Sequence, residues 1–334
     1  MNLAYHFYNE DCVAGARAHL DDNSVDLIIT DPPFAIEGDK LHKHYNRKEV
    51  FVIEGYIEIP KEEYAVFSRE WIHEAERVLR PGGSMAIVSG YTNLLDILNA
   101  LRETCLQEVN HIIWKYSFGV STKSKFVSSH YHILFYTKPG GKRTFNTFSR
   151  YGSQEKSENN RSLLYRDLED VWIINREYKP GEKKNKNELP SELLVKLIQY
   201  LSNPGDVVCD FFLGGFSTAK VAKALGRCAV GFELNALSFH HHVSEVDEIE
   251  ENEWIDKVKN GVDDTPAKAG APWSDGDIER LRTRFRELRR SGLTKNKTIV
   301  ILCKEFERGS WSIIKRLDAM GIKEDQDLIL PLIQ

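Results

Sequence analysis

The sequence is poor in cysteine, with five in 334 residues, and no two of them stand at the spacing of zinc ligands. Scattered cysteines exclude a disulfide framework and a cysteine-based zinc site, and they are typical of a reducing cytoplasm. His42 and His44 lack a cysteine or carboxylate partner at suitable spacing, so we expect no metal site. A secretory signal and an apolar run long enough to span a bilayer are also missing, which predicts a cytoplasmic protein with no membrane partner.

An overall excess of positive charge is absent as well. The net charge is −5, so the total gives no indication of nucleic acid binding. The charges are unevenly distributed, however. Lysines and arginines outnumber acids by 10 to 7 in residues 139–184 and by 12 to 7 in residues 275–320, whereas acids prevail by 9 to 2 in residues 241–265. Two basic segments that flank an acidic one fit a local polyanion-binding face, and chance patterning is the alternative.

Residues 25–34, Val-Asp-Leu-Ile-Ile-Thr-Asp-Pro-Pro-Phe, organise the rest of the chain. The run at 27–29 is short, apolar and unbroken, as in a strand buried on both faces of a parallel sheet. Pro32 and Pro33 cannot continue a hydrogen-bonded ladder, so the strand must stop there. Asp31 is therefore expected at the carboxyl end of a central strand, where open α/β sheets bind ligands. A plain Pro-Pro turn with a solvated Asp31 is the alternative.

Strand and helix patterns alternate through the first 240 residues. We expect helices over residues 62–80, 92–104 and 191–201, and strands over 84–89, 111–116 and 130–137. This alternation predicts an α/β fold with a doubly wound, mostly parallel sheet. The polar residues 35–62 directly follow the Asp31 strand, which is typical of a mobile lid or a DNA-facing loop.

A second ligand-binding pattern spans residues 206–233. A strand leads into a turn with Gly214 and Gly215, then a helix, and then a strand that ends at Glu233. The glycines let the backbone approach a ligand closely, and the N–H groups of the new helix can bind a carboxylate or a phosphate. Glu233 is placed to accept hydrogen bonds from a ribose diol. No Lys-Ser/Thr pair follows the glycines, which argues against a nucleoside triphosphate P-loop.

Residues 139–184 interrupt the α/β pattern. Their basic side chains are interleaved with aromatic ones, which suits contact with phosphates and bases, although a plain surface insertion fits the composition almost as well. Apolar signals at 163–165 and 171–174 predict a small core within the segment.

The end of the chain is expected to form a separate helical domain over residues 273–334, after an acidic linker at 241–272. A basic helix at 275–291 precedes two helices that have the layout of a helix-turn-helix. The second of these would present to DNA the side chains of Ser310, Ser312, Lys315 and Arg316. A helical hairpin used for packing or dimerisation is the alternative.

The two ligand-binding motifs together resemble those of the β-type DNA amino-methyltransferases, which methylate adenine N6 or cytosine N4. Asp31-Pro-Pro-Phe34 resembles their catalytic (D/N/S)PP(Y/F/W) signature, and residues 210–218, Asp-Phe-Phe-Leu-Gly-Gly-Phe-Ser-Thr, resemble their S-adenosylmethionine loop, DPFxGSGTT. Further matches lie at 77–83, 112–114, 130–134, 170–172 and 203–210. The resemblance covers about residues 5–240. It implies a class I methyltransferase-like domain over 1–240 in circularly permuted order, with 139–184 in the target-recognition position.

This resemblance implies the chemistry and the site residues. The catalytic residues would be Asp31, Pro32, Pro33 and Phe34, with Asp31 and the Pro32 carbonyl accepting hydrogen bonds from the target amine and Phe34 stacking on a flipped-out base. The cofactor S-adenosylmethionine would contact Asp31, Asp210, Phe212, Gly214, Gly215, Ser217, Thr218, Glu233 and Asn187. Double-stranded DNA would be the partner, bound in the 139–184 segment by Arg143, Arg150 and Arg161. The family also allows a homodimer and a cognate restriction endonuclease as partners.

The resemblance leaves the target base and the activity itself open. Asp at the first position of the catalytic motif favours N6 of adenine, and N4 of cytosine is the alternative. Residues 185–190, Asn-Lys-Asn-Glu-Leu-Pro, depart from the family's HPxQKP-like segment, and Phe211 and Phe216 replace a Pro and a Gly of the cofactor loop. A second alternative is therefore a DNA-binding regulator on a decayed methyltransferase scaffold, against which the intact Asp31 motif and Glu233 argue.

Overall fold

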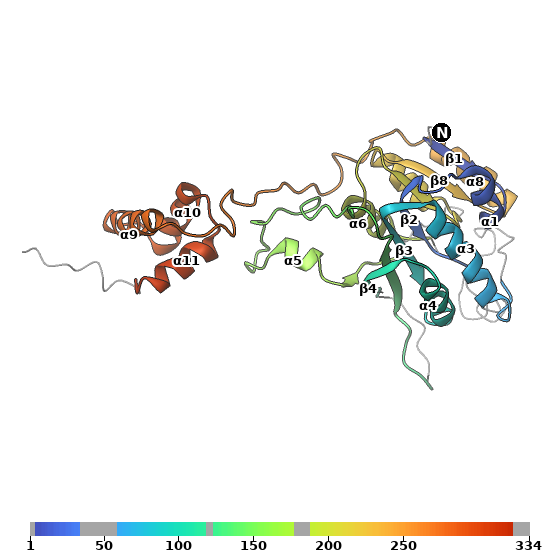
Figure 1. The fold of residues 1–334 in the computed structure, drawn as a ribbon, viewed down its shortest axis with the longest axis horizontal. Coiled ribbons are helices and arrows are strands. Elements are labelled where there is room, and N and C mark those ends of the chain that lie inside the picture. The colour runs from blue at the N-terminus through green and yellow to red at the C-terminus, as the bar shows by residue number, and fades with distance from the viewer. Residues whose placement is uncertain (1–3, 34–58, 118–122, 177–187, 323–334) are drawn as a thin grey trace, which may run out of the picture. The chain divides into compact units, whose positions relative to one another are not determined.

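The structure is a computed structural model, and it describes residues 4–33, 59–117, 123–176 and 188–322. The chain divides into two compact units, which consist of Met1–Tyr151 with Leu163–Val262 and of Gly152–Ser162 with Asp263–Gln334. The first unit contains the β-sheet, and the larger segment of the second unit carries α9, α10 and α11 (Figure 1).

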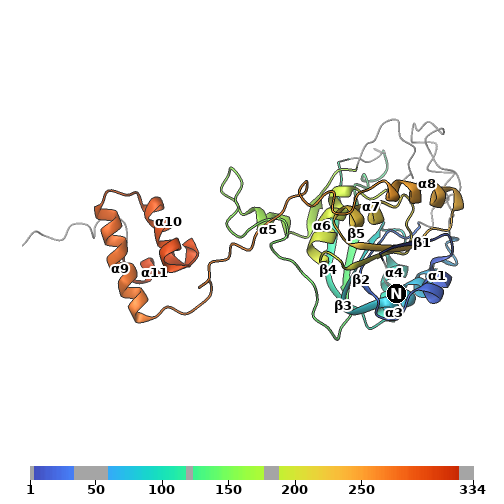
Figure 2. The same cartoon turned by 90° about the horizontal axis from the view of Figure 1, so that it is seen from above.

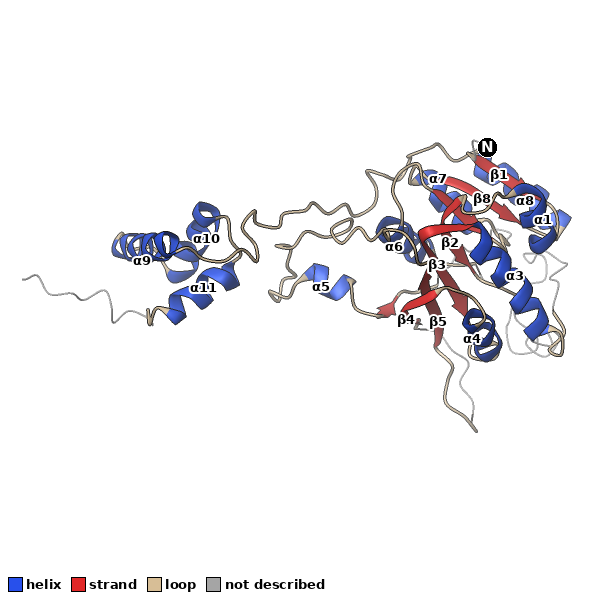
Figure 3. Ribbon diagram, viewed as in Figure 1, coloured by secondary structure: helices blue, strands red, loops and turns tan. Residues whose placement is uncertain are grey.

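The strands of the first unit form an eight-stranded sheet in the order β1-β8-β7-β2-β3-β5-β4-β6. Figure 3 draws the strands in red and the helices in blue. The strand β5 runs antiparallel to both of its neighbours, and the other described pairings are parallel. The bounds are β1 (Tyr5–Tyr8), β2 (Val25–Thr30), β3 (Leu79–Ser89), β4 (Gln107–Lys115), β5 (His130–Thr137), β6 (Val171–Ile173), β7 (Val207–Asp210) and β8 (Cys228–Phe232).

Helices pack on both faces of this sheet (Figure 2). One face carries α1 (Cys12–His19), α3 (Tyr64–Val78) and α4 (Leu94–Arg102), and the other carries α6 (Ser191–Leu201), α7 (Ser217–Ala224) and α8 (Ala236–Asp247). In β2, Leu27 and Ile29 pack toward the second group and Ile28 toward the first, and all three are fully buried. The mostly parallel pairing and the helices on both faces confirm the expected doubly wound α/β fold. The apolar run at 27–29 is buried on both faces for the same reason.

The strand β3 begins earlier than the sequence predicts. It follows α3 at once, and Pro81, Gly82 and Gly83 lie inside it, where its register against β2 shifts. Gly82 adopts φ +77°, and a Cβ atom there would lie 2.4 Å from the carbonyl oxygen of Lys142. These residues therefore do not separate the helix from the strand; they let a neighbouring backbone approach the strand closely.

The segment after β5 adds a short helix, α5 (Leu163–Asp167), and the edge strand β6, which pairs with β4. Trp172 and Ile174 are buried as expected. The small core predicted at 163–165 is wrong, because α5 buries none of its residues and Tyr165 is 72% exposed.

The acidic segment 241–272 is not a linker along its whole length. The helix α8 continues to Asp247 and buries Val246, and Trp254 and Val258 pack against the same core. The first unit consequently extends to Val262 rather than ending near residue 240. Although the segment is rich in acidic residues, its apolar side chains are spaced so that they can pack against the core of the sheet.

In the second unit, α9 (Asp275–Arg290), α10 (Lys295–Phe306) and α11 (Ser310–Ala319) surround a core of their own, which includes Leu281, Leu302, Phe306, Ile313 and Leu317. Ser274 and Thr294 cap the first two helices through their side-chain oxygens. Residues 307–309 form the short turn between α10 and α11, with Glu307 at φ 53°. Across the described residues, no helix combines the length and apolarity that crossing a bilayer requires.

Candidate functional site

Three acidic residues lie at the carboxyl ends of three adjacent parallel strands. Asp31 follows β2, Asp210 ends β7 and Glu233 follows β8. The Oγ1 atom of Thr30 donates a 2.9 Å hydrogen bond to Oδ1 of Asp210, which ties the ends of β2 and β7 together. The catalytic and cofactor motifs, about 180 residues apart in sequence, thus meet at one sheet edge, as parallel pairing requires.

Asp31 is half-buried, and one of its two carboxylate oxygens has no partner among the described residues. Its Oδ1 atom is inaccessible to solvent and accepts no hydrogen bond from any residue that the structure describes. Burial, and then the charge of Asp210, hold the pKa of Asp31 well above its usual value, whereas the charge of Arg176 lowers it. Pro32 is buried and Pro33 half-buried, and Phe34 lies outside the described residues. An unpaired buried acceptor of this kind is ready to receive a donor from a ligand.

A small pocket adjoins Asp31. Its walls are formed by Asp31, Val88, Trp114, Tyr131, Arg176, Glu188 and Leu189. Sequence reasoning did not assign Trp114, Tyr131, Arg176 or Glu188 to the site. The first two lie in stretches that match the family, at 112–114 and 130–134, and that match was the available signal. Arg176 precedes residues 177–187, which lie outside the described residues, and Glu188 follows them.

Glu233 holds the glycine loop in place. Its Oε2 atom accepts a hydrogen bond from the backbone N–H of Gly214 at 2.8 Å, and its Oε1 atom accepts one from Asn235 at 2.7 Å. Ser238 on α8 donates to the Gly214 carbonyl at 2.9 Å. Burial raises the pKa of Glu233, and the two backbone donors counteract that rise. Each carboxylate oxygen keeps a second lone pair, so the ribose contact expected of Glu233 is sterically and chemically compatible with these bonds.

The rest of the glycine loop is also closely packed. A Cβ atom on Gly215 would lie 2.5 Å from Oε1 of Glu188, so glycine is required for Glu188 to lie against the loop. Thr218 donates a side-chain hydrogen bond to Asp210, which also accepts from the N–H of Phe212 at 3.0 Å. Ser217 begins α7 and is half-buried. The expected cofactor residues on this loop therefore share one site, and Asn187 lies outside the described residues.

Phe216, which departs from the family pattern, points into the core. It adopts the left-handed conformation, with φ 57°, and is fully buried. Its ring packs against Phe7 at 5.2 Å, Phe239 at 5.9 Å and His242 at 6.1 Å between centroids. The backbone conformation that glycine would adopt is therefore retained, and burial of the ring offsets the strain of about 1–3 kcal/mol.

The arginines expected to contact DNA in the 139–184 segment have different environments. Arg143 and Arg161 are exposed. The prediction that Arg150 contacts DNA from the surface is wrong. Arg150 is only 8% exposed, and its Nε atom donates a hydrogen bond to Asp167 at 2.9 Å. A buried guanidinium needs such a partner, and sequence composition does not reveal which arginine will be buried. Arg150 is a structural residue.

The four residues expected on the second helix of the helix-turn-helix also differ. Ser310 and Lys315 are exposed on α11, next to the exposed Trp311. Ser312 and Arg316 are half-buried, since Ser312 accepts a hydrogen bond from Trp273 at 3.3 Å and the Arg316 guanidinium lies 5.6 Å from the centre of the Trp273 ring. Half of the predicted set thus helps to hold the helical unit together.

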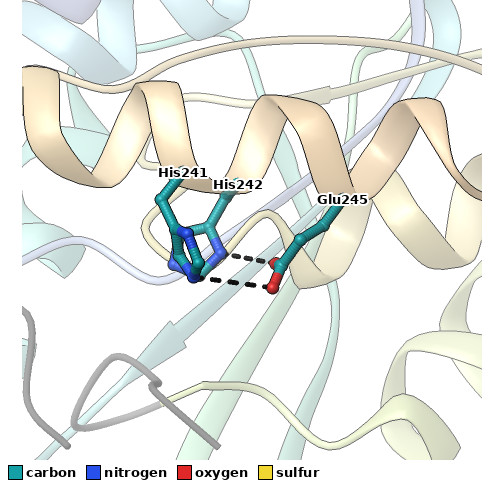
Figure 4. Close-up of side chains that lie close together, drawn as sticks. All are labelled: His241, His242 and Glu245. Carbon is teal, nitrogen blue, oxygen red and sulfur yellow. Dashed lines mark hydrogen bonds and ion pairs between the residues drawn. The ribbon is translucent and has the colours of Figure 1, made fainter.

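One cluster with metal-ligand chemistry appears among the described residues: His241, His242 and Glu245 on α8 (Figure 4). His242 Nδ1 lies 2.7 Å from Glu245 Oε2, and the ammonium of Lys220 lies 2.5 Å from the same oxygen. Burial raises the pKa of Glu245, but hydrogen bonds from Lys220 and His242 outweigh it and lower the pKa to about 2. Because Lys220 supplies the positive charge, the cluster is an ion-pair network that joins α7 to α8.

Comparison with known proteins finds relatives that are similar to this chain over about two thirds of its length. The Type II methyltransferase M.HpaI of Haemophilus parainfluenzae is 29% identical over 223 residues, which are 66% of this chain and 67% of the relative. The Type II methyltransferase M.BamHI of Bacillus amyloliquefaciens is 32% identical over 250 residues, 68% of this chain and 54% of the relative, so the match spans about half of M.BamHI.

Two solved structures share the fold. TTHA0409 of Thermus thermophilus, determined with S-adenosyl-L-methionine, has a TM-score of 0.53 at 22% identity and covers 73% of this chain and 94% of its own. The PvuII cytosine-N4-specific DNA methyltransferase has a TM-score of 0.52 at 15% identity and covers 74% and 92%. The family profile described as DNA methylase, for N6 and N4 methyltransferases, matches residues 25–241. This chain belongs to that DNA methylase family.

Proposed function

We propose that the protein methylates the exocyclic N6 of adenine at a specific site in double-stranded DNA, on a base flipped out of the duplex. The observation that carries the proposal is the Oδ1 atom of Asp31, which is buried and unpaired among the described residues and lies at a small pocket. The Asp-Pro-Pro-Phe form of the motif favours adenine. Methylation of cytosine N4 is the second candidate, because the family includes both reactions and a structural neighbour is cytosine-N4-specific.

The residues of this chain would activate the amine by position and charge. The lone pair of an exocyclic amine is delocalised into the base, so the nitrogen is a poor nucleophile. The carboxylate of Asp31 and the carbonyl of Pro32 would accept its two hydrogens, which favours a tetrahedral nitrogen with a localised lone pair. Phe34, which lies outside the described residues, would stack on the base. No covalent enzyme intermediate is required.

The cofactor would bind at the loop between β7 and α7. The unpaired Asp31 oxygen, the glycines and the acid at the end of β8 fit a nucleoside with a cationic amino acid tail. Asp210, Phe212, Gly214, Gly215, Ser217, Thr218 and Glu233 would hold it. When bound, S-adenosylmethionine supplies an electrophilic methyl group on a positively charged sulfur.

The exposed arginines 143 and 161 and the exposed face of α11 would contact the DNA backbone and bases. In this proposal residues 139–184 include the target-recognition segment, and the C-terminal helical unit, with Ser310 and Lys315, is a duplex reader. A cognate restriction endonuclease and a homodimer remain part of the same proposal, since the named relatives are Type II methyltransferases.

Long-read methylome sequencing of DNA from cells that express the protein tests the proposal, with the Asp31→Ala variant as the control. N6-methyladenine at a defined motif, absent with the variant, is the expected result. N4-methylcytosine at a defined motif would select the second candidate. Absence of modification with the wild-type protein would overturn the enzymatic proposal and favour a DNA-binding regulator on a decayed scaffold.

A further inference from the structure

Arg176 is a half-buried cation fixed beside the Asp31 cavity by aromatic rings. It lies three residues after the end of β6, and its Nη2 atom donates a 2.7 Å hydrogen bond to the hydroxyl of Tyr131. Its guanidinium carbon is 4.6 Å from the centre of the Tyr116 ring and 5.2 Å from that of Tyr131. Trp114 stacks on Tyr131 with centroids 5.4 Å apart. These contacts orient the guanidinium at little further cost in side-chain entropy.

Asp31 and Arg176 line the same cavity, and each has an unused polar atom. The Oδ1 atom of Asp31 is a buried acceptor without a donor, and the Nε atom of Arg176 is a buried donor without an acceptor, in each case among the residues that the structure describes. A buried donor or acceptor without a partner destabilises the folded protein. A ligand that presents a donor next to an acceptor would satisfy both.

The amino edge of adenine has this pattern, because the N6 amine is a donor and the neighbouring ring nitrogen N1 is an acceptor. Cytosine has the same pattern at N4 and N3. On its Watson–Crick edge, guanine has an amine, N2, beside a second donor at N1, and thymine has no amine. The pair Asp31–Arg176 therefore matches the Watson–Crick edge of adenine or cytosine and mismatches that of guanine or thymine.

We propose that Arg176 is a specificity-determining residue that donates a hydrogen bond to the ring nitrogen beside the target amine, while Asp31 accepts from the amine itself. The inference rests on the proposed function and adds to it the residue that recognises the base. The hydrogen bond from Arg176 would also align the base so that its amine points toward Asp31 and Pro32. It predicts that the ring nitrogen of the base contributes to catalysis only when Arg176 is present.

A double-mutant cycle, in which one change is made in the protein and the other in the target base, tests the coupling between Arg176 and the ring nitrogen. The substrates are a duplex that contains the methylated motif and the same duplex with a carbon in place of the target ring nitrogen, 1-deazaadenine for adenine or 3-deazacytosine for cytosine. The kcat/KM of the wild-type protein, Arg176→Ala and the control Arg166→Ala, an exposed arginine on α5, would be measured on both. The cycle cancels the intrinsic change in reactivity of the deaza base. Calorimetry with S-adenosylmethionine would confirm that each variant retains a folded cofactor site.

We expect the deaza base to reduce kcat/KM about 10- to 100-fold more for the wild-type protein and Arg166→Ala than for Arg176→Ala, the effect of one lost base-edge contact. Equal reductions for all three proteins would overturn the role of Arg176 and leave the proposed function intact. No methylation of the natural duplex by the wild-type protein would overturn both proposals together.

Discussion

Two clusters of buried charge lie in the first unit, and they differ in how their charges are paired. In one, the carboxylate of Asp167 forms ion pairs with Arg150 at 2.9 Å and with Lys196 at 3.5 Å. It also accepts a 2.6 Å hydrogen bond from the hydroxyl of Tyr200. In the other, Asp31 receives no hydrogen bond at Oδ1 within the described parts of the chain.

Both arrangements desolvate a carboxylate, but only the first compensates it with protein partners. The ion pairs of Asp167 anchor the segment that carries α5, whereas we propose that the unpaired oxygen of Asp31 accepts a hydrogen bond from a ligand. Variants at the two acids test whether one is structural and the other catalytic.

The largest effect is expected from Asp31→Ala. Removing the acceptor for the target amine should lower kcat/KM for DNA methylation about 10³-fold or more, because the interaction strengthens as the amine becomes tetrahedral. Methyl transfer from labelled S-adenosylmethionine to DNA measures it, with the exposed Asp21→Ala as the control. Retention of more than a tenth of the activity would show that Asp31 is not the acceptor.

Asp167→Ala should act on stability rather than on chemistry. It leaves Arg150 and Lys196 buried without their carboxylate, which should lower the free energy of unfolding by about 3–5 kcal/mol. Urea unfolding measures the loss, and Asp170→Ala, an exposed neighbour, should change little. A variant as stable as the wild-type protein would erase the distinction between the two clusters.

Glu233→Ala should combine both effects, since this acid is paired and also faces the proposed cofactor site. Two backbone N–H groups lose their acceptor, which should cost about 1–3 kcal/mol of unfolding free energy. The affinity for S-adenosylmethionine should fall at least tenfold, measured by calorimetry. Unchanged affinity in a folded variant would remove Glu233 from the cofactor site.

Asp31→Asn should stabilise the protein at neutral pH while it abolishes methylation. The pKa of Asp31 is higher in the folded than in the unfolded protein, so ionising it destabilises the fold once the pH exceeds the unfolded value of about 3.9. That cost grows until the pH passes the folded pKa. The melting temperature of the variant should therefore exceed that of the wild-type protein at pH 7 and equal it near pH 3.5; a gain at both pH values would have another cause.

The same titration should appear in catalysis. Because protonation would remove the negative charge with which Asp31 accepts the amine hydrogen, the kcat/KM of the wild-type protein should fall as the pH decreases through the raised pKa of Asp31. Arg176→Ala should move the midpoint to higher pH, since Arg176 lowers that pKa.

The smallest effect is expected from Arg143→Ala, the exposed counterpart of the buried Arg150. Loss of one phosphate contact should weaken DNA binding a few-fold at low salt and reduce the slope of log K against log salt by about one, without changing the melting temperature. Fluorescence anisotropy across a salt series measures it. A lower melting temperature would place Arg143 with the structural arginines.

The local elements, and the residues placed at their ends, could be predicted from the amino-acid sequence. The apolar run that stops at two prolines places Asp31 at a strand end, the glycine pair places a turn before α7, and residues 191–201 form the predicted helix. These features depend on neighbours in the chain, on prolines that cannot pair and on side chains that repeat with the period of a helix.

Which of these residues lie close together depends on long-range strand pairing, which the sequence does not reveal. Parallel pairing of β2, β7 and β8 brings Asp31, Asp210 and Glu233 to one edge, and the edge strand β6 carries Arg176 to the Asp31 cavity from 145 positions along the chain. Burial likewise turned Arg150 from an expected DNA contact into the partner of Asp167. Charged side chains look alike in a sequence, and their roles depend on desolvation and on partners that only long-range packing supplies.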